Sequence, residues 1–323
     1  MTTDSMSARR RATTRDYIRI ARLDHWIKNL FIMPGFFAAY VLTETETGTS
    51  PLVMRLLAAF LATSLVASSN YVINEWLDAK YDRFHPVKKL RPVVVAELRF
   101  PYVMAEYALL AILGLVLSLF ISPLFFFMSL WLFVMGIVYN VKPLRTKDVP
   151  YLDALSESVN NMIRLLMGWF VVTNTSLPPC SLVLGYWMCG AFLMATKRFA
   201  EYRMINNPSQ AGLYRKSFQL YTEPSLMVSS FCYALAAMFF IGIFLVKYRV
   251  ELVFSIPFLI ALFGNYISLA YQDDSAVQKP EKLYHEKGLM MLSIAFGIAL
   301  VLGFCVKLPW LGIFVSNSLI SIP

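Results

Sequence analysis

Charged side chains are scarce in this chain. Asp, Glu, Lys and Arg make up 15% of its 323 residues, whereas hydrophobic residues make up 58%. A soluble globular domain carries about 25% charged residues, so this chain lacks the polar surface that would keep it in water. Apolar stretches of roughly 20 residues, long enough to cross the hydrocarbon core of a bilayer, recur along it. The composition therefore excludes an ordinary soluble protein and predicts a polytopic membrane protein.

Signals of several common functional classes are also missing. The four cysteines have no metal-ligand spacing and the three histidines are dispersed, so neither residue type predicts a metal site. No Ser–His–Asp arrangement, glycine-rich nucleotide loop, internal repeat or low-complexity linker is legible. The first 25 residues are polar and Arg-rich, without an apolar core before a small-residue cleavage site. We therefore expect no cleavable signal peptide.

The apolar stretches predict an all-α bundle of about nine transmembrane helices. We expect them at about 26–43, 53–77, 101–121, 124–140, 152–173, 181–199, 225–246, 250–271 and 288–307. Prolines lie near many of the expected ends. The expected organisation is a basic N-terminal segment over residues 1–25, followed by a single transmembrane catalytic domain over residues 26–323.

Basic residues are distributed unevenly between the two sides of this expected bundle. Of the 29 Lys and Arg, 24 fall in the N-terminal segment and in four loops that nine spans place on the same side. The positive-inside rule then predicts that the N-terminus and these loops are cytoplasmic, in the inner (plasma) membrane, with the active site on that side. The excess of positive charge suits anionic head groups and anionic substrates, and we expect no nucleic acid partner.

The most informative polar pattern lies between residues 70 and 92. Asn70, Asn74, Asp78 and Asp82 recur every four residues and so share one helical face, with Glu75 beside them. Carboxylate and amide oxygens in this arrangement suit Mg²⁺ completed by substrate phosphates. The cations that follow, suited to the phosphates themselves, are Lys88, Lys89 and Arg91. The alternative is an ordinary helix end exposed to solvent. Asn70 and Asn74, however, lie within or at the edge of an apolar span, where burying a polar side chain costs free energy.

A second polar pattern runs from the third cytoplasmic segment, the loop at about 140–152, into the next helix. Asp153, Glu157, Asn160 or Asn161, and Arg164 form a stripe at helical spacing, which predicts a polar cavity inside the bundle. The alternative is an ionic network that only holds helices together. The preceding loop carries four residues suited to phosphate, which are Tyr139, Lys142, Arg145 and Lys147.

A third group, Lys197, Arg198 and Glu201, ends an apolar helix. Basic residues at a cytoplasmic helix end are often membrane anchors that also complement the helix dipole, and Glu201 could equally form a surface pair with Lys197.

Taken with these motifs, the chain resembles the UbiA-type prenyltransferase superfamily. Asn74, Glu75, Asp78 and Asp82 match its first signature, with Glu75 where Asp is usual. Within the superfamily, the similarity is greatest to the decaprenyl-phosphate phosphoribosyltransferases. Their signature is matched by Asp78, Asp82, His85, Pro86, Lys88, Arg91 and Pro92. Weaker matches are Trp26, Lys28 and Asn29; Tyr139, Lys142, Pro150 and Asp153; and Pro280 and Glu281.

The resemblance implies Mg²⁺-dependent transfer of 5-phosphoribose from phosphoribosyl pyrophosphate to a polyprenyl, decaprenyl-like phosphate, for cell-wall arabinan precursors. The implied catalytic and metal-binding residues are Asn74, Glu75, Asp78 and Asp82. The implied substrate-binding residues are Lys28, Asn70, Lys88, Arg91, Tyr139, Lys142, Asp153, Arg164, Lys197, Arg198 and Glu201. The implied partners are the two substrates and the membrane, with a homo-oligomer left open.

Two other functions are consistent with parts of the sequence. A UbiA-type aromatic polyprenyltransferase would have a second acidic motif where Lys197 and Arg198 stand, and acids are scarce there. A secondary transporter would explain buried charges such as Asp153 and Arg164, but inverted repeats and helices broken at the midplane are not evident.

Overall fold

The computed structural model describes residues 9–43, 49–272, 275–278 and 280–315. The chain forms two compact units, the first comprising Met1–Ser176 with Ile205–Tyr221 and the second Leu177–Met204 with Thr222–Pro323. The segment 205–221 therefore returns to the first unit after the chain has entered the second.

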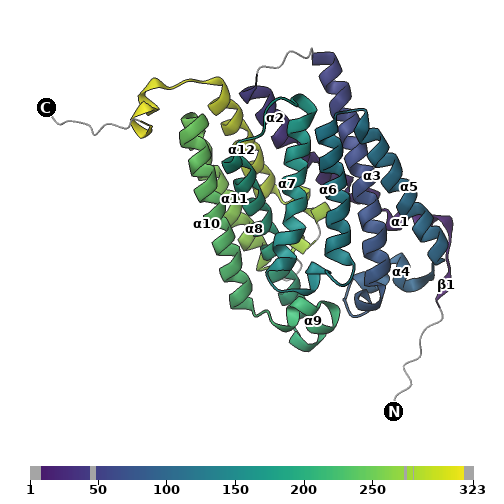
Figure 1. Cartoon of the computed structure of the whole chain (residues 1–323). Helices are drawn as coiled ribbons and strands as arrows, with labels where there is room; N and C mark the ends of the chain where they lie inside the picture. Colours follow the sequence, from purple (N-terminus) through teal and green to yellow (C-terminus); the bar gives the residue numbers. More distant parts are fainter. Residues whose placement is uncertain (1–8, 44–48, 273–274, 279, 316–323) are drawn as a thin grey trace. The chain divides into compact units, whose positions relative to one another are not determined.

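The first unit contains most of the named polar residues. Its α-helices are α1 (Thr14–Ile20), α2 (Met33–Leu42), α3 (Thr49–Asp82), α4 (Pro92–Val95), α5 (Phe100–Leu119), α6 (Pro123–Asn140), α7 (Leu152–Val172) and α9 (Pro208–Tyr214). Its 3-10 helices are η1 (Leu23–Ile32), η2 (Lys88–Leu90), η3 (Thr146–Asp148) and η4 (Lys216–Gln219). Two short strands, β1 (Arg10–Arg11) and β2 (Ala96–Glu97), pair in parallel. Helix α3 packs against α5 and α6, while α7 packs against α2 and α6 (Figure 1).

The second unit is built mainly from long apolar helices. These are α8 (Cys180–Ile205), α10 (Glu223–Tyr248), α11 (Ile256–Ala270) and α12 (Lys287–Cys305). The last residue of α8, Ile205, is already part of the first unit. Shorter 3-10 helices are η5 (Val250–Ser255), η6 (Ala276–Gln278), η7 (Pro280–His285) and η8 (Pro309–Phe314).

Proline and capping residues explain where several helices begin. Pro123 opens α6, and Ser122 before it accepts a hydrogen bond from the backbone nitrogen of Phe125 at 3.1 Å. Thr222 caps α10 in the same way, through the backbone nitrogen of Ser225 at 3.2 Å. A helix start suits proline because its missing N–H would have had no partner inside the helix.

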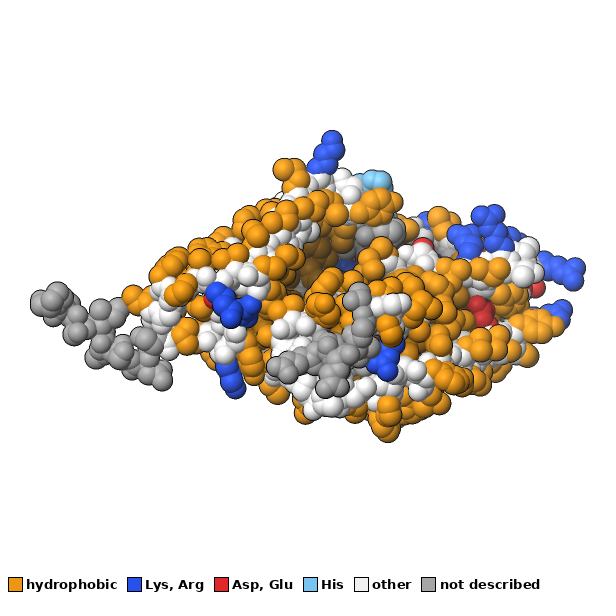
Figure 2. Space-filling model, turned by 90° about the horizontal axis from the view of Figure 1, so that it is seen from above, with side chains coloured by type: hydrophobic (Ala, Val, Ile, Leu, Met, Phe, Trp, Pro, Cys, Tyr) orange, Lys and Arg blue, Asp and Glu red, His pale blue; other side chains and the backbone are white. Residues whose placement is uncertain are grey.

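The apolar helices identify a multi-pass membrane protein. Among the described residues, seven helical segments are long and apolar enough to span a bilayer, in Ser50–Asp82, Phe100–Leu119, Pro123–Asn140, Cys180–Ile205, Glu223–Tyr248, Val250–Ala270 and Lys287–Cys305. Large hydrophobic side chains are exposed along these helices, for example Leu109, Ile112 and Val116 of α5, as expected of surfaces that contact lipid. Figure 2 views the protein from above and shows hydrophobic side chains over much of that face as well. The structure therefore confirms the predicted all-α membrane bundle.

The two remaining predicted spans are also helical, but they differ from simple apolar helices. The span expected at 26–43 is divided into η1 and α2, and that at 152–173 is α7, which carries Asp153, Glu157 and Arg164. The count of nine spans and the cytoplasmic N-terminus remain predictions.

Two glycines let α7 lie very close to the end of η1 and to α2. A Cβ atom placed on Gly168 of α7 would lie 2.0 Å from the carbonyl oxygen of Ile32, and one placed on Gly35 of α2 would lie 1.8 Å from that of Leu165. Both obstructing atoms belong to the backbone, so a side chain cannot move aside to make room. Small residues commonly allow such close helix contacts in membranes.

We expect Gly168→Ala to destabilise the protein by about 3 kcal/mol, since overpacking against the backbone forces the helices apart. The thermal unfolding midpoint in detergent should fall by roughly 5 °C or more. Gly242→Ala is the control, because no atom lies within 4 Å of the Cβ position there. Equal midpoints for the two variants would show that the close approach is not required for stability.

Candidate functional site

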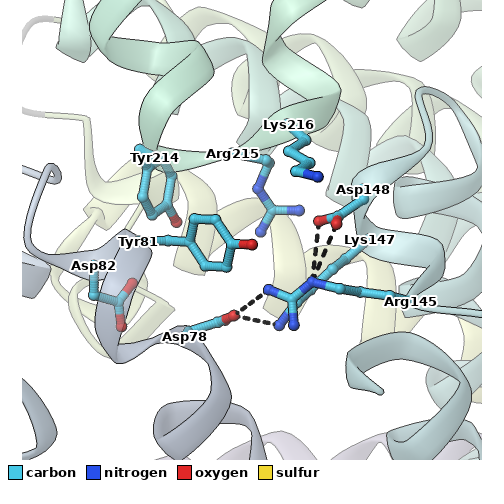
Figure 3. Close-up of a pocket in the computed structure, with 9 residues that line it drawn as sticks. All are labelled: Asp78, Tyr81, Asp82, Arg145, Lys147, Asp148, Tyr214, Arg215 and Lys216. Atoms are coloured by element: carbon cyan, nitrogen blue, oxygen red, sulfur yellow. Dashed lines mark hydrogen bonds and ion pairs between the residues drawn. The ribbon is translucent and has the colours of Figure 1, made fainter. Parts of the chain in front are cut away.

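A pocket in the first unit gathers charged residues from three separate segments (Figure 3). The segments are the C-terminal end of α3, the loop containing η3, and the turn from α9 into η4. Its lining residues are Asp78, Tyr81, Asp82, Arg145, Lys147, Asp148, Tyr214, Arg215 and Lys216.

The two aspartates reach the pocket because they lie one turn apart on α3. Asp78 Oδ1 accepts hydrogen bonds from Lys147 Nζ at 2.5 Å and from an Arg145 guanidinium nitrogen at 2.9 Å (Figure 3). Asp82 Oδ2 accepts one from Arg91 at 2.7 Å. Each carboxylate is therefore matched with at least one cation, as a buried charge requires.

Arg145 is held in an unusual backbone conformation. Its φ of 29° is positive, a conformation that costs free energy in a residue other than glycine. Its guanidinium also donates to Asp148 at 3.2 Å and to the carbonyl oxygen of Asn140 at 2.8 Å. These bonds stabilise the strained loop and direct the positive charge toward α3.

Lys147 is almost completely buried beside the same aspartate. Burial lowers the pKa of Lys147 to about 8, although the nearby Asp78 opposes the shift. Its ammonium group also donates to Asn140 Oδ1 at 2.7 Å. Lys147 therefore loses its proton at a lower pH than a surface lysine does.

The two asparagines of the α3 stripe lie outside the pocket lining and contact α6. Asn74 Nδ2 donates to Asn140 Oδ1 at 2.5 Å, and Asn70 Nδ2 donates to the carbonyl oxygen of Leu132 at 2.8 Å. The buried Oδ1 atom of Asn70 has no hydrogen-bond partner. Both side chains therefore connect α3 to α6, at positions on α3 that precede the two aspartates.

Glu75 also lies outside the pocket lining, between two arginines. Its Oε1 atom is 3.4 Å from Arg22 and 3.6 Å from Arg91. Burial opposes the charge of Arg91, but the carboxylates of Asp82 and Glu75 outweigh it and raise the pKa of Arg91 above its usual value. Glu75 thus connects the end of α3 with the N-terminal segment and with Arg91.

Asp153 anchors the returning segment 205–221 to α7. This side chain is fully buried, and its carboxylate accepts hydrogen bonds from the Tyr221 hydroxyl at 2.7 Å and the Ser217 hydroxyl at 3.1 Å. Arg215 lies 3.5 Å from the same carboxylate. The interactions hold the segment that supplies three lining residues of the pocket.

The other members of the second predicted pattern lie near this anchor or away from the pocket. Tyr139 donates to Glu157 at 2.8 Å and receives a hydrogen bond from Arg215 at 3.3 Å. Arg164 donates to Asn29 Oδ1 at 2.9 Å. Lys142 is exposed and does not line the pocket.

Lys88 extends the basic surroundings of the pocket. Its ammonium group contacts the hydroxyl of Tyr214 and lies 4.6 Å from the centre of that ring. The imidazole of His85 packs edge-on against the same ring, with centroids 4.6 Å apart. Tyr214 therefore connects the loop after α3 with the returning segment.

The third predicted group belongs to the second unit. Arg198 and Glu201 are buried on α8 and lie 3.6 Å apart, and Lys197 beside them is half-buried. None of the three lines the pocket of the first unit. The side chains of Pro280 and Glu281 lie outside the described part of the structure.

Five lining residues were not singled out from the sequence, namely Tyr81, Asp148, Tyr214, Arg215 and Lys216. The adjacent Arg215 and Lys216 carried a weak signal, because they are basic residues of an expected cytoplasmic loop. Tyr81 and Asp148 adjoin predicted residues and could have been found by extending those patterns.

Two carboxylates of the pocket are of the chemical type that binds a magnesium ion. In the described ranges no group of three or more His, Cys, Asp and Glu side chains is placed to hold a metal by itself. Asp78 and Asp82 nevertheless bring two carboxylates to one pocket rich in cations. Such a pair suits Mg²⁺, which usually takes one or two carboxylates and completes its shell with water and phosphate oxygens.

Comparison with known proteins identifies one family and several relatives. The model of the UbiA prenyltransferase family matches residues 31–292. The decaprenyl-phosphate phosphoribosyltransferase of Mycolicibacterium smegmatis is 28% identical over 65% of this chain, and the match spans 63% of that protein. The protein of the same name from Mycobacterium tuberculosis is 24% identical over 65% of this chain and 67% of its own. A UbiA homologue from Archaeoglobus fulgidus, solved with GPP and Mg²⁺, shares the fold with a TM-score of 0.66 and 18% identity, over 90% of this chain and 98% of its own.

Proposed function

Because the chain belongs to the UbiA prenyltransferase family, we propose that it transfers 5-phosphoribose from phosphoribosyl pyrophosphate to a decaprenyl-like polyprenyl phosphate. The reaction releases diphosphate. The product would be a lipid-linked phosphoribose, a precursor of arabinose donors for cell-wall polymers. The relatives named above support this choice of substrates.

The observation that carries the proposal is the excess of cations around the three aspartates that line the pocket, Asp78, Asp82 and Asp148. Four basic side chains line the pocket, namely Arg145, Lys147, Arg215 and Lys216, and two more, Lys88 and Arg91, contact residues of its lining. Phosphoribosyl pyrophosphate carries a diphosphate and a separate 5-phosphate. Fixed guanidinium and ammonium groups bind such oxygens strongly.

The proposed reaction needs positioning and charge compensation more than proton transfer. An oxygen of the lipid phosphate forms a bond to the anomeric carbon while the bond from that carbon to diphosphate breaks. The acceptor is already an anion, so no strong base is required. Lys147, Arg145 and Arg215, which line the pocket, would stabilise the negative charge that develops on the leaving diphosphate.

Magnesium would add to this compensation of charge. Asp78 and Asp82 would hold the ion, and Asn74 and Glu75 belong to the same proposed set of metal residues. When bound, Mg²⁺ would neutralise part of the negative charge of the diphosphate. The remaining proposed substrate contacts are Lys28, Asn70, Tyr139, Lys142, Asp153, Arg164, Lys197, Arg198 and Glu201.

Purified protein should form labelled lipid from polyprenyl phosphate and labelled phosphoribosyl pyrophosphate, and the yield should fall to background when Mg²⁺ is chelated. An aromatic polyprenyltransferase is the second candidate, because the fold is shared with a homologue solved with a prenyl diphosphate. Prenylation of an aromatic acid, with no transfer of ribose phosphate, would replace our proposal with that one.

We also propose that the pocket faces the cytoplasm. The native cysteines, three of them exposed, are first replaced, and single cysteines are then introduced at Lys89 and Thr175. A membrane-impermeant maleimide applied to intact cells should label Thr175→Cys and leave Lys89→Cys unlabelled until the membrane is opened. Labelling of Lys89→Cys in intact cells would show that the pocket faces the outside of the cell, the opposite of our proposal.

A further inference from the structure

A second cavity of the first unit lies between α3, α4 and the residue that precedes β1. Its volume is about 380 Å³, within the usual range for a small-molecule site. Its lining residues include Arg9, Trp76, Ala79, Lys80, Arg83 and Val94. It shares no lining residue with the pocket of Figure 3. We call it the α3–α4 cavity.

The helical period places this cavity and the pocket on different faces of α3. Trp76, Lys80 and Arg83 are spaced by four and three residues, so they share one helical face. At 3.6 residues per turn, Lys80 lies about 160° around the helix axis from both Asp78 and Asp82. The α3–α4 cavity is therefore a separate site rather than an extension of the pocket.

Positive charge is concentrated in the α3–α4 cavity. Arg9, Lys80 and Arg83 are exposed basic side chains that line it, and no described lining residue is an Asp or a Glu. The pocket of Figure 3 differs in this respect, because three aspartates lie among its cations. The α3–α4 cavity is therefore suited to a ligand that brings its own negative charge.

The N-terminal segment holds Arg9 beside α3. The residues that follow Arg9 form β1, which pairs with β2, so that Arg10 lies opposite Ala96. Two guanidinium nitrogens of Arg10 donate to the Asp16 carboxylate, at 2.7 and 2.5 Å. Strand β2 directly follows α4, which packs against α3 and carries Val94 of the cavity lining (Figure 1). Pairing of the strands thus brings a third cation to a cavity whose other two belong to the end of α3.

The inner wall of the α3–α4 cavity is apolar and lies near the membrane boundary. Trp76, Ala79 and Val94 pack against a buried hydrophobic cluster of the first unit. The ring of Trp76 lies 5.7 Å from that of Phe100, which is 54% exposed and begins the apolar helix α5. Tryptophan is enriched at the boundary between head groups and acyl chains. A lipid could therefore place its phosphate on the cations of the cavity while its chains remain in the hydrocarbon.

We propose that the α3–α4 cavity binds the head group of an anionic phospholipid from the surrounding membrane. Arg9, Lys80 and Arg83 contact the phosphate, and Trp76 contacts the apolar part of the lipid next to it. Basic pockets beside membrane-spanning helices suit such head groups. A soluble phosphate compound would share the ionic contacts, but it would not use the aromatic wall. The site takes no part in the proposed transfer of ribose phosphate and does not depend on it.

The test is lipid binding to the full-length protein in detergent micelles, measured by native mass spectrometry. Phosphatidylglycerol should bind roughly tenfold more tightly than phosphatidylcholine with the same chains, because choline places a positive charge against three cations. Lys80→Gln and Arg83→Gln should each weaken binding of phosphatidylglycerol about tenfold, the effect of losing one charge-assisted hydrogen bond. Arg83→Lys should retain most of the affinity. Arg19→Gln is the matched control, because Arg19 is exposed on α1, lies outside the cavity lining and removes the same charge.

A photoactivatable phosphatidylglycerol, with its reactive group in the head group, locates the site directly. Crosslinks should fall within residues 76–83 and at Val94. Crosslinks confined to other segments would overturn the proposal, and so would equal affinity for phosphatidylglycerol in the wild type, Lys80→Gln and Arg83→Gln.

Inorganic phosphate is the probe for a soluble ligand. Displacement of phosphatidylglycerol by millimolar phosphate would assign the cavity to a soluble anion and contradict a lipid site. An equal loss of lipid binding in Arg19→Gln would show that only the overall charge matters. None of these measurements requires turnover, so failure of the proposed reaction and failure of the lipid site are observed separately.

Discussion

Asp78→Asn and Asp82→Asn are each expected to lower kcat by about 100-fold or more while leaving the protein folded. Each change removes one negative charge and preserves the size of the side chain. The variants should bind Mg²⁺ less tightly and so stabilise the leaving diphosphate less, which is an effect on the transition state. Initial rates measured over a series of Mg²⁺ concentrations test this expectation.

The control for these variants is Glu97→Gln, which removes an exposed carboxylate of the same unit at β2. Thermal unfolding midpoints should be compared for all three proteins, because Arg145 and Arg91 lose charged partners when the aspartates change. Near-wild-type activity of either aspartate variant at limiting Mg²⁺ would show that its carboxylate does not hold the metal.

Arg145→Gln should raise the Michaelis constant for the ribosyl donor about 30-fold. The side chain is buried and pairs with both Asp78 and Asp148, so the change removes a fixed positive charge from the pocket. A charge-assisted hydrogen bond contributes about 1.5 to 3 kcal/mol, which corresponds to a loss of this size. The Michaelis constant for the lipid should change much less, and steady-state kinetics with each substrate varied in turn would show this.

Arg99→Gln serves as the control, because Arg99 is exposed at the start of α5 and outside the pocket lining. Its kinetic constants should match those of the wild type. An equal rise in both Michaelis constants for Arg145→Gln would contradict a role limited to the donor. Unchanged Michaelis constants for that variant would show that Arg145 does not contribute to donor binding.

The helical residues of the pocket could be predicted, because periodicity alone places them. Asp78 and Asp82 are one turn apart in a long apolar helix, and the structure brings both to one pocket. The resemblance to the UbiA superfamily, which the family match confirms, rested on the same residues. Their roles in catalysis and metal binding remain predictions.

The loop residues could not be predicted in the same way. Arg145 reaches Asp78 through a left-handed backbone conformation, which no pattern in the sequence reveals. Arg215 joins the pocket because Asp153 anchors its segment to a helix more than 60 residues earlier. Tertiary contacts of this kind depend on the packed fold rather than on local spacing.

Polar residues inside the apolar helices were ambiguous for another reason. Asn70 and Asn74 were expected to serve substrate and metal, and the structure shows them bonded to α6. A buried amide must find partners whether it binds a ligand or joins two helices. The sequence shows that such a group is present, but it does not identify the partner.

The return of residues 205–221 to the first unit limits how this protein can be divided. A fragment ending at residue 176 would contain both aspartates of α3 but lack Tyr214, Arg215 and Lys216. Asp153 would also lose the hydroxyls of Ser217 and Tyr221 and leave a buried charge without these partners. The two halves of the gene are therefore not independent modules. Splitting, fusing or shuffling them would preserve the pocket only if the later half supplied this short stretch.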